Sequence, residues 1–178
     1  MIKYIYLGVA CGLLFLLNAD VALASDGQIS NANTAWILTS TALVLFMTLP
    51  GLAFFYGGMV SKKNVISTML QSFIALGVIS LVWVLFGFSL AFGDSIGGWG
   101  IIGHPSQFAL LNNLDSQNSN IPYLLFALFQ LKFAIITPAI ITGSFAERIR
   151  FRSYLLFMIL FCVFIYAPLA HMTWSSGG

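Results

Sequence analysis

The feature that most constrains this chain is a series of long apolar runs with almost no charge inside them. Four of these runs are expected to be transmembrane helices, at residues 34–60, 65–92, 121–146 and 151–172. Each is long enough, at about 1.5 Å per residue, to cross a hydrocarbon core of roughly 30 Å. Only 7% of the residues are charged, so the chain cannot cover a water-facing surface with polar groups. The pattern predicts an all-α integral membrane protein, a polytopic helical bundle.

Residues 1–24 are typical of a signal peptide. A lysine near the start precedes a short apolar centre, and Ala22-Leu23-Ala24 forms a small-x-small cleavage site. The alternative is a short additional transmembrane helix, but polar residues follow the apolar centre at once. Cleavage would leave residues 25–178 with their N-terminus outside the cell.

The basic residues predict the orientation of the chain in the membrane. They lie in two short loops, with Lys62 and Lys63 in one and Arg148, Arg150 and Arg152 in the other. The long polar connection at residues 95–120 has no lysine or arginine. Cytoplasmic loops carry the excess of positive charge. We therefore expect the two basic loops inside the cell, and residues 95–120 outside the plasma membrane.

Several functional classes find no support in the sequence. There is no basic run for nucleic acid, and no nucleophile–base pair of an enzyme. Cys11 and Cys162 are expected to be packing residues, and His104 is a single histidine in a loop. We expect no metal site and no cofactor. Glu147, beside Arg148, is interpreted as an ion-pair partner at the membrane surface.

One helix face in the third run has two interpretations. Its members recur at helical spacing: Phe129, Phe133, Ile136, Ile140 and Ser144. They could form a gate above a dry conduit, whereas the stripe taken alone favours ordinary packing. Lys132 lies within the same run, where a charge either has a function or anchors the helix by reaching the interface.

The fourth run ends in an aromatic and polar cluster, Ala170-His171-Met172-Thr173-Trp174. A tryptophan ring attracts small cations through its quadrupole. Trp174 is thus a candidate cation contact at the outer mouth of the bundle. His171 is expected to hold a backbone carbonyl or to shape that mouth.

Together these segments resemble the ammonium transporter (Amt/Mep/Rh) family, over residues 34–178. The matching motifs are T-A-L-V-L-F-M-T-L-P-G at 41–51, F-F-Y-G-G at 54–58, K-N-V at 63–65, S-L-A-F-G at 89–93, Phe129-Gln130, Phe133-Ala134, F-A-E-R at 145–148 and P-L-A-H-M-T-W at 168–174. Because several motifs occur in the family's order, the resemblance is specific.

The resemblance implies a homotrimer of eleven-helix subunits, each with a narrow apolar pore for ammonium or ammonia. It implies that Trp174 and Phe129 belong to an outer vestibule and that Phe133 is the outer ring of a gate. Leu52 and Ile140 match apolar positions along the conduit.

The resemblance covers only the N-terminal part of the family, whose pore histidines lie further along. We expect the 178 residues alone to be inactive, and to contribute to ammonium transport as part of a full-length transporter. The alternative is a non-conducting membrane ammonium sensor or assembly subunit. A regulatory protein on the cytoplasmic side is a further implied partner. Lys132 departs from the small or apolar residue expected at its position.

Overall fold

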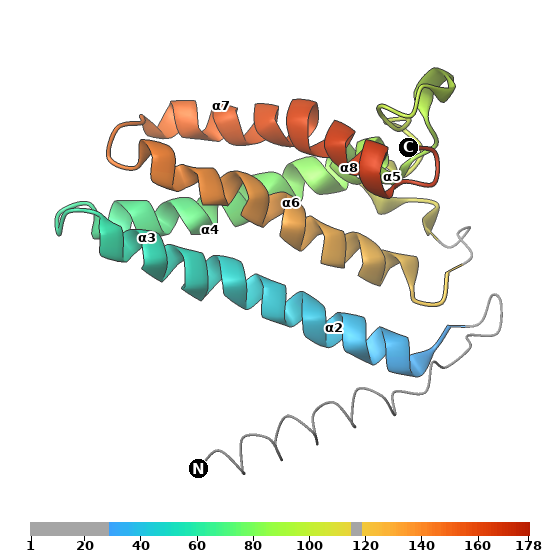
Figure 1. Cartoon of the computed structure of the whole chain (residues 1–178), viewed down its shortest axis with the longest axis horizontal. Helices are drawn as coiled ribbons and strands as arrows, with labels where there is room; N and C mark the ends of the chain where they lie inside the picture. Colours follow the sequence, from blue (N-terminus) through green and yellow to red (C-terminus); the bar gives the residue numbers. More distant parts are fainter. Residues whose placement is uncertain (1–28, 115–118) are drawn as a thin grey trace, which may run out of the picture.

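The computed structural model describes residues 29–114 and 119–178 (Figure 1). The expected signal peptide, residues 1–24, lies outside the described residues. Within the described part, the regular elements are helices, and a single isolated bridge joins Ser95 to Gly103.

Four helices of the described part are long and apolar enough to cross a membrane: Asn31–Met59, Val65–Phe92, Tyr123–Phe145 and Phe151–Trp174. The first comprises α2 (Asn31–Phe46), a π-helical segment (Met47–Leu52) and α3 (Ala53–Met59). The second comprises α4 (Val65–Val82), a π-helical segment (Trp83–Gly87) and α5 (Phe88–Phe92). The third is α6 (Tyr123–Phe145), and the fourth is α7 (Phe151–Phe161), a π-helical segment (Cys162–Tyr166) and α8 (Ala167–Trp174). The prediction of an all-helical membrane bundle is confirmed.

Two of the described π-helical segments have a proline as a local cause, and the other ends at a closely packed glycine. Pro50 lies inside the first one and has no N–H to donate to the Phe46 carbonyl, so the helical ladder widens there. Pro168 lies just after the third and removes a donor in the same way. In the second, a Cβ atom on Gly87 would lie 3.2 Å from both the Trp83 ring and the Val82 carbonyl oxygen. Pro50 and Pro168 thus account for the π-helical segments of the first and fourth membrane helices, whereas α6 contains Pro138 and remains α-helical throughout.

The buried core of the bundle runs along α4, α5, α6 and the fourth membrane helix, from Tyr154 near the basic end to Ala170 near the loop end. Small buried residues such as Ala75, Ala134 and Ala139 allow the helices to approach closely. Trp83 Nε1 donates a hydrogen bond to the Ala127 carbonyl at 3.1 Å, and the Tyr154 hydroxyl donates to the Gln71 carbonyl at 3.0 Å. Polar groups within a bilayer need such internal partners. By contrast, α2 packs on α6 but has no buried residue of its own.

The two ends of the bundle differ in character. The loop end comprises residues 93–114, residues 119–122 and Ser175–Gly178, which lie on one side of the helices. The basic end comprises residues 60–64 and 146–152, on the opposite side (Figure 1).

At the loop end, the connection after α5 folds back onto that helix. The Ser89 hydroxyl donates to the His104 carbonyl at 2.7 Å and accepts from the Phe108 N–H at 2.9 Å. The Gly103 N–H donates to the Leu90 carbonyl at 2.8 Å. A Cβ atom on Gly103 would lie only 2.6 Å from the Ser89 carbonyl oxygen. The loop can therefore lie this close to α5 only because residue 103 is glycine.

At the basic end, Glu147 joins the two loops. Its Oε1 accepts hydrogen bonds from the Ser61 N–H at 2.8 Å, from the Ser61 hydroxyl and from Asn64 Nδ2 at 3.0 Å. These bonds, led by that of the Ser61 hydroxyl, lower the pKa of Glu147 to about 2, and the charge of Arg148 adds the smallest contribution. The interpretation of Glu147 as an ion-pair partner is therefore corrected: its main partners are the hydrogen-bond donors of the facing loop.

Candidate functional site

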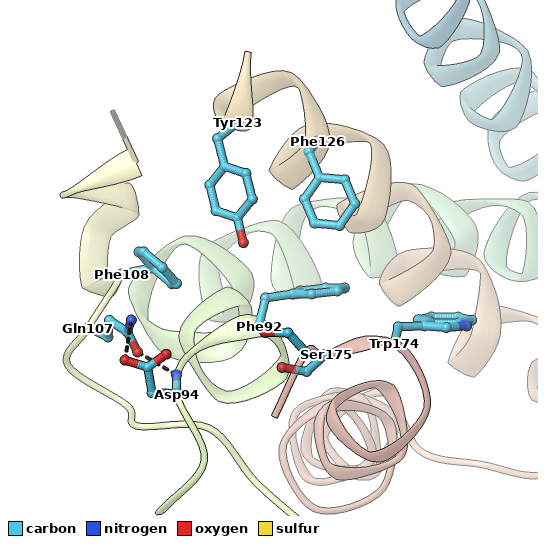
Figure 2. A pocket seen from close by; sticks show the side chains of 9 residues that line it. Phe92, Asp94, Gln107, Phe108, Tyr123, Phe126, Trp174 and Ser175 are labelled. Atoms are coloured by element: carbon cyan, nitrogen blue, oxygen red, sulfur yellow. Dashed lines mark hydrogen bonds between the residues drawn. The ribbon is translucent and has the colours of Figure 1, made fainter. Parts of the chain in front are cut away.

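An aromatic pocket of about 210 Å³ lies at the loop end of the bundle (Figure 2). Its wall includes Phe92 at the end of α5, Tyr123 and Phe126 in the first turn of α6, and Trp174 at the end of α8. Asp94 is also part of the wall and adds a carboxylate. We call this the loop-end pocket.

The packing of α8 on α5 places Trp174 at this pocket. His171 is fully buried, and its Nδ1 lies 3.1 Å from the Ala91 carbonyl oxygen, to which it donates. The buried residues Ala167 and Ala170 allow the two helices to come together. The expectation that His171 holds a backbone carbonyl is confirmed. Trp174 follows within one helical turn and remains 56% exposed, so its ring is accessible.

The other rings of the pocket hold one another in place. The Phe92 and Phe126 rings lie 5.0 Å apart, nearly perpendicular, at 79°. The Tyr123 and Phe126 rings are stacked, with centroids 5.4 Å apart and an angle of 19°. Both geometries are favourable for aromatic pairs. The wall formed by these rings is therefore ordered before any ligand arrives.

Phe129 and Phe133 form a separate aromatic pair further along α6. Their ring centroids lie 5.0 Å apart at 77°, an edge-to-face contact, and both side chains are half-buried. Among the described residues that line the loop-end pocket, neither is present. The structure thus brings the two phenylalanines into contact with each other, and places Trp174 beside Phe126 and Phe92.

The two expected conduit residues lie in different environments. Leu52, at the end of the π-helical segment after α2, is half-buried against the core. The Ile140 side chain on α6 is 52% exposed, while its carbonyl accepts a hydrogen bond from the Tyr56 hydroxyl. Lys132, on the same helix, is half-buried.

Sequence reasoning missed Phe92, Asp94 and Phe126 as parts of the pocket. The helical spacing could have predicted Phe126, since it lies three residues before Phe129 and extends the same stripe toward the helix start. No sequence pattern could have predicted Phe92 and Asp94, because their place in the same pocket as Trp174 depends on the contact between α5 and α8.

The described residues offer little to bind a metal ion. In residues 29–114 and 119–178, no three side chains of His, Cys, Asp or Glu gather closely enough to hold one. What the loop-end pocket provides is aromatic faces, neutral oxygen atoms and a single carboxylate.

Comparisons with known proteins point to one family. The model of the Ammonium Transporter Family matches residues 35–178. An ammonium transporter of Aquifex aeolicus is 44% identical over 168 residues, which are 93% of this chain and 39% of that protein. The structure matches the crystal structure of Saccharomyces cerevisiae Mep2 with a TM-score of 0.74 and 32% identity, over 85% of this chain and 33% of the Mep2 chain. A structure entitled "Sensor Amt Protein" matches with a TM-score of 0.74 and 29% identity, over 81% of this chain and 34% of its own. The chain spans well under half the length of these relatives, and it belongs to the ammonium transporter family.

Proposed function

We propose that this chain takes part in ammonium or ammonia transport across the plasma membrane, as the N-terminal part of a complete transporter subunit. The family match over residues 35–178 carries the proposal. The loop-end pocket supports it, because the aromatic faces around Trp174 suit the capture of a small cation.

The proposed path runs from the loop-end pocket along α6. Trp174 holds the cation by its ring face, and Phe129 provides a second ring near the entrance. Phe133 is the gate, which excludes water while its ring blocks the path. Leu52 and Ile140 line the apolar conduit beyond, and the 52% exposure of Ile140 supports this role because its side chain is available to a passage completed by other segments. An apolar conduit passes ammonia more readily than a hydrated metal cation, which it cannot resolvate.

The proposed orientation places the loop end outside the cell and the basic end in the cytoplasm. It rests on the lysines and arginines of the basic end and on their absence from residues 93–122. Single cysteines at positions 112 and 63 test it by labelling of intact cells with an impermeant reagent. We expect labelling of Asn112→Cys alone; labelling of Lys63→Cys from outside would reverse the topology.

The test of transport is uptake of labelled methylammonium by cells that lack their own transporters. We expect uptake from a complete subunit that carries these residues, and none from residues 1–178 expressed alone. Robust uptake by the 178 residues alone would contradict the need for further segments. No uptake by the complete subunit would contradict the transport proposal.

The alternative function is a non-conducting ammonium sensor or assembly subunit. The similarity to the structure entitled "Sensor Amt Protein" favours it. A sensor would bind methylammonium at the membrane but would not accumulate it inside vesicles, so equilibrium binding and uptake by the same reconstituted protein separate the two functions.

The complete protein is proposed to form a homotrimer and to meet a regulatory protein at its cytoplasmic side. Cleavage of a signal peptide at residue 24 is proposed to place the mature N-terminus outside. Cross-linking in native membranes and N-terminal sequencing of the mature protein test these two points.

A further inference from the structure

The loop-end pocket contains a charge that the proposed aromatic path does not use. Asp94 follows directly after α5 and Gly93, and it lies across the pocket from Trp174 (Figure 2). Gln107 Nε2 donates a hydrogen bond to Asp94 Oδ2 at 3.0 Å, and Gln107 Oε1 accepts one from the Asp94 N–H. These reciprocal bonds fix the carboxylate at the wall of the pocket.

No positive side chain lies near this carboxylate along the loop. Residues 93–122 and 175–178 contain no lysine or arginine, and the titratable base of these segments is His104. Asp94 is the one acidic residue of the loop end that the structure describes. Since no lysine or arginine of these segments neutralises it, its negative charge acts on any cation that approaches the pocket.

The aromatic ring faces of the pocket also attract cations, as the Asp94 carboxylate does. In the view of Figure 2, the Tyr123 hydroxyl points from α6 toward Phe92, and Phe92 and Ser175 lie between Asp94 and Trp174. Aromatic faces attract cations and a hydroxyl oxygen accepts hydrogen bonds from them. An ammonium-type cation, with N–H donors and a single charge, can use all three kinds of group.

The pocket does not suit a divalent metal ion. Calcium takes six to eight oxygen ligands and magnesium a near-ideal octahedron, whereas the described wall offers a single carboxylate with neutral oxygens. At about 210 Å³, the space also exceeds what a bare monovalent ion needs. The cation can enter with part of its water shell.

We propose that Asp94, fixed by Gln107, is a cation-binding residue that concentrates ammonium-type cations in the loop-end pocket before they reach Trp174. This inference rests on the proposed transport function. It assigns Asp94 an electrostatic role in collecting the cation, distinct from the aromatic contact of Trp174 and from the gate at Phe133.

Asp94 also has a structural role, which the test must separate from cation binding. Its hydrogen bonds to Gln107 and the bond from the His104 N–H to its carbonyl fasten the loop to the end of α5. Asp94→Asn separates the two roles, because the amide oxygen still accepts from Gln107 while the charge is lost.

The experiment is methylammonium uptake by a complete subunit that carries these residues, measured over a range of concentrations at low ionic strength. We expect Asp94→Asn to raise the half-saturating concentration roughly threefold to tenfold with the maximal rate unchanged. The difference should shrink at high salt, because screening shortens the reach of the charge. Asp94→Glu should resemble the parent protein.

A relocated charge gives the sharper test. Ser176 also lines the pocket. Ser176→Asp in the Asp94→Asn background therefore places a carboxylate at a different position in the pocket wall. We expect it to recover part of the lost affinity. Asn112→Ala, on the same loop and away from the pocket, is the matched control.

The outcomes are distinguishable. No uptake by the parent subunit contradicts the proposed function itself. Normal uptake by the parent with an unchanged half-saturating concentration in Asp94→Asn overturns the inference and leaves transport intact. A lower amount of folded Asp94→Asn with an unchanged half-saturating concentration also overturns it, since Asp94 would then only fasten the loop.

Discussion

The loop end and the basic end of this bundle are held together by different interactions. At the loop end, rings stack on one another and a glycine allows the chain to lie directly on α5. At the basic end, one carboxylate, Glu147, collects three hydrogen bonds from the facing loop and lies in fully exposed surroundings. The loop end is ordered by ring packing together with hydrogen bonds that fasten the loop to α5, and the basic end by charge-assisted hydrogen bonds to Glu147.

The two kinds of interaction predict different mechanical properties for the two ends. The packed rings constrain one another, which preorganises the wall for the proposed capture of a small cation. Exposed hydrogen bonds are weak individually and exchange with water, so loops joined by them can separate with little cost. We therefore expect mutations at the loop end to change stability and binding, and mutations at the basic end to change loop motion.

The largest effect is expected from Gly103→Ala at the loop end. The added methyl group would lie 2.6 Å from the Ser89 carbonyl oxygen and 2.9 Å from that of Gly93, so backbone must move. Overpacking of this kind costs about 2–3 kcal/mol. Thermal unfolding in detergent measures it, with Gly77→Ala as the control because a Cβ atom there meets nothing within 4 Å. Equal stability of the two variants would show that the loop does not lie tightly on α5.

The next effect concerns recognition, in a complete subunit. Trp174→Leu removes the exposed ring and should weaken cation capture by about 1–2 kcal/mol, a change of roughly fivefold to thirtyfold. Competition of ammonium, sodium and potassium with methylammonium uptake is the measurement. Phe133→Ala is the comparison, because loss of a gate ring should alter passage and admit larger species with less effect on outer binding. If neither variant changes uptake or competition, these aromatics are packing residues.

A smaller effect is expected at the basic end. Glu147 has a φ of +66°, a conformation that glycine adopts without strain. Glu147→Ala loses the hydrogen bonds and keeps the strain, whereas Glu147→Gly loses the bonds and relieves it. Both should speed amide hydrogen exchange at Ser61 and Asn64, with alanine the less stable of the two. Exchange that is unchanged in both variants would show that Glu147 does not hold the loops together.

The smallest effect is a dependence on pH that is confined to the basic end. The pKa of Glu147 is lowered from 4.5 to about 2, so its ionised form is favoured by the folded loops. A lowered pKa contributes stability that is present above the unfolded value and is lost as the pH falls through the folded value. The protection of the Ser61 amide, measured relative to its intrinsic exchange rate at each pH, should therefore fall between about pH 4.5 and pH 2. A matching loss of protection in Glu147→Gln would assign the change to another group.

Much of the architecture could be predicted because it depends on local composition. Uncharged runs of membrane length become helices wherever they lie in the chain, and Pro50 and Pro168 disturb their ladders through their own missing N–H groups. The family motifs also lie in continuous segments, such as residues 168–174, and the family assignment from them is confirmed.

The tertiary structure alone decided which residues meet. Asp94 and Trp174 are far apart in the sequence and line one pocket because α8 packs on α5 through His171 and Ala91. Glu147 was expected to pair with its arginine neighbours, yet its partners come from the loop before α4. Composition determines that a segment enters the membrane, since the cost of burying charge is local. Which side chains then share a pocket depends on contacts between distant helices, and those are set only when the helices pack.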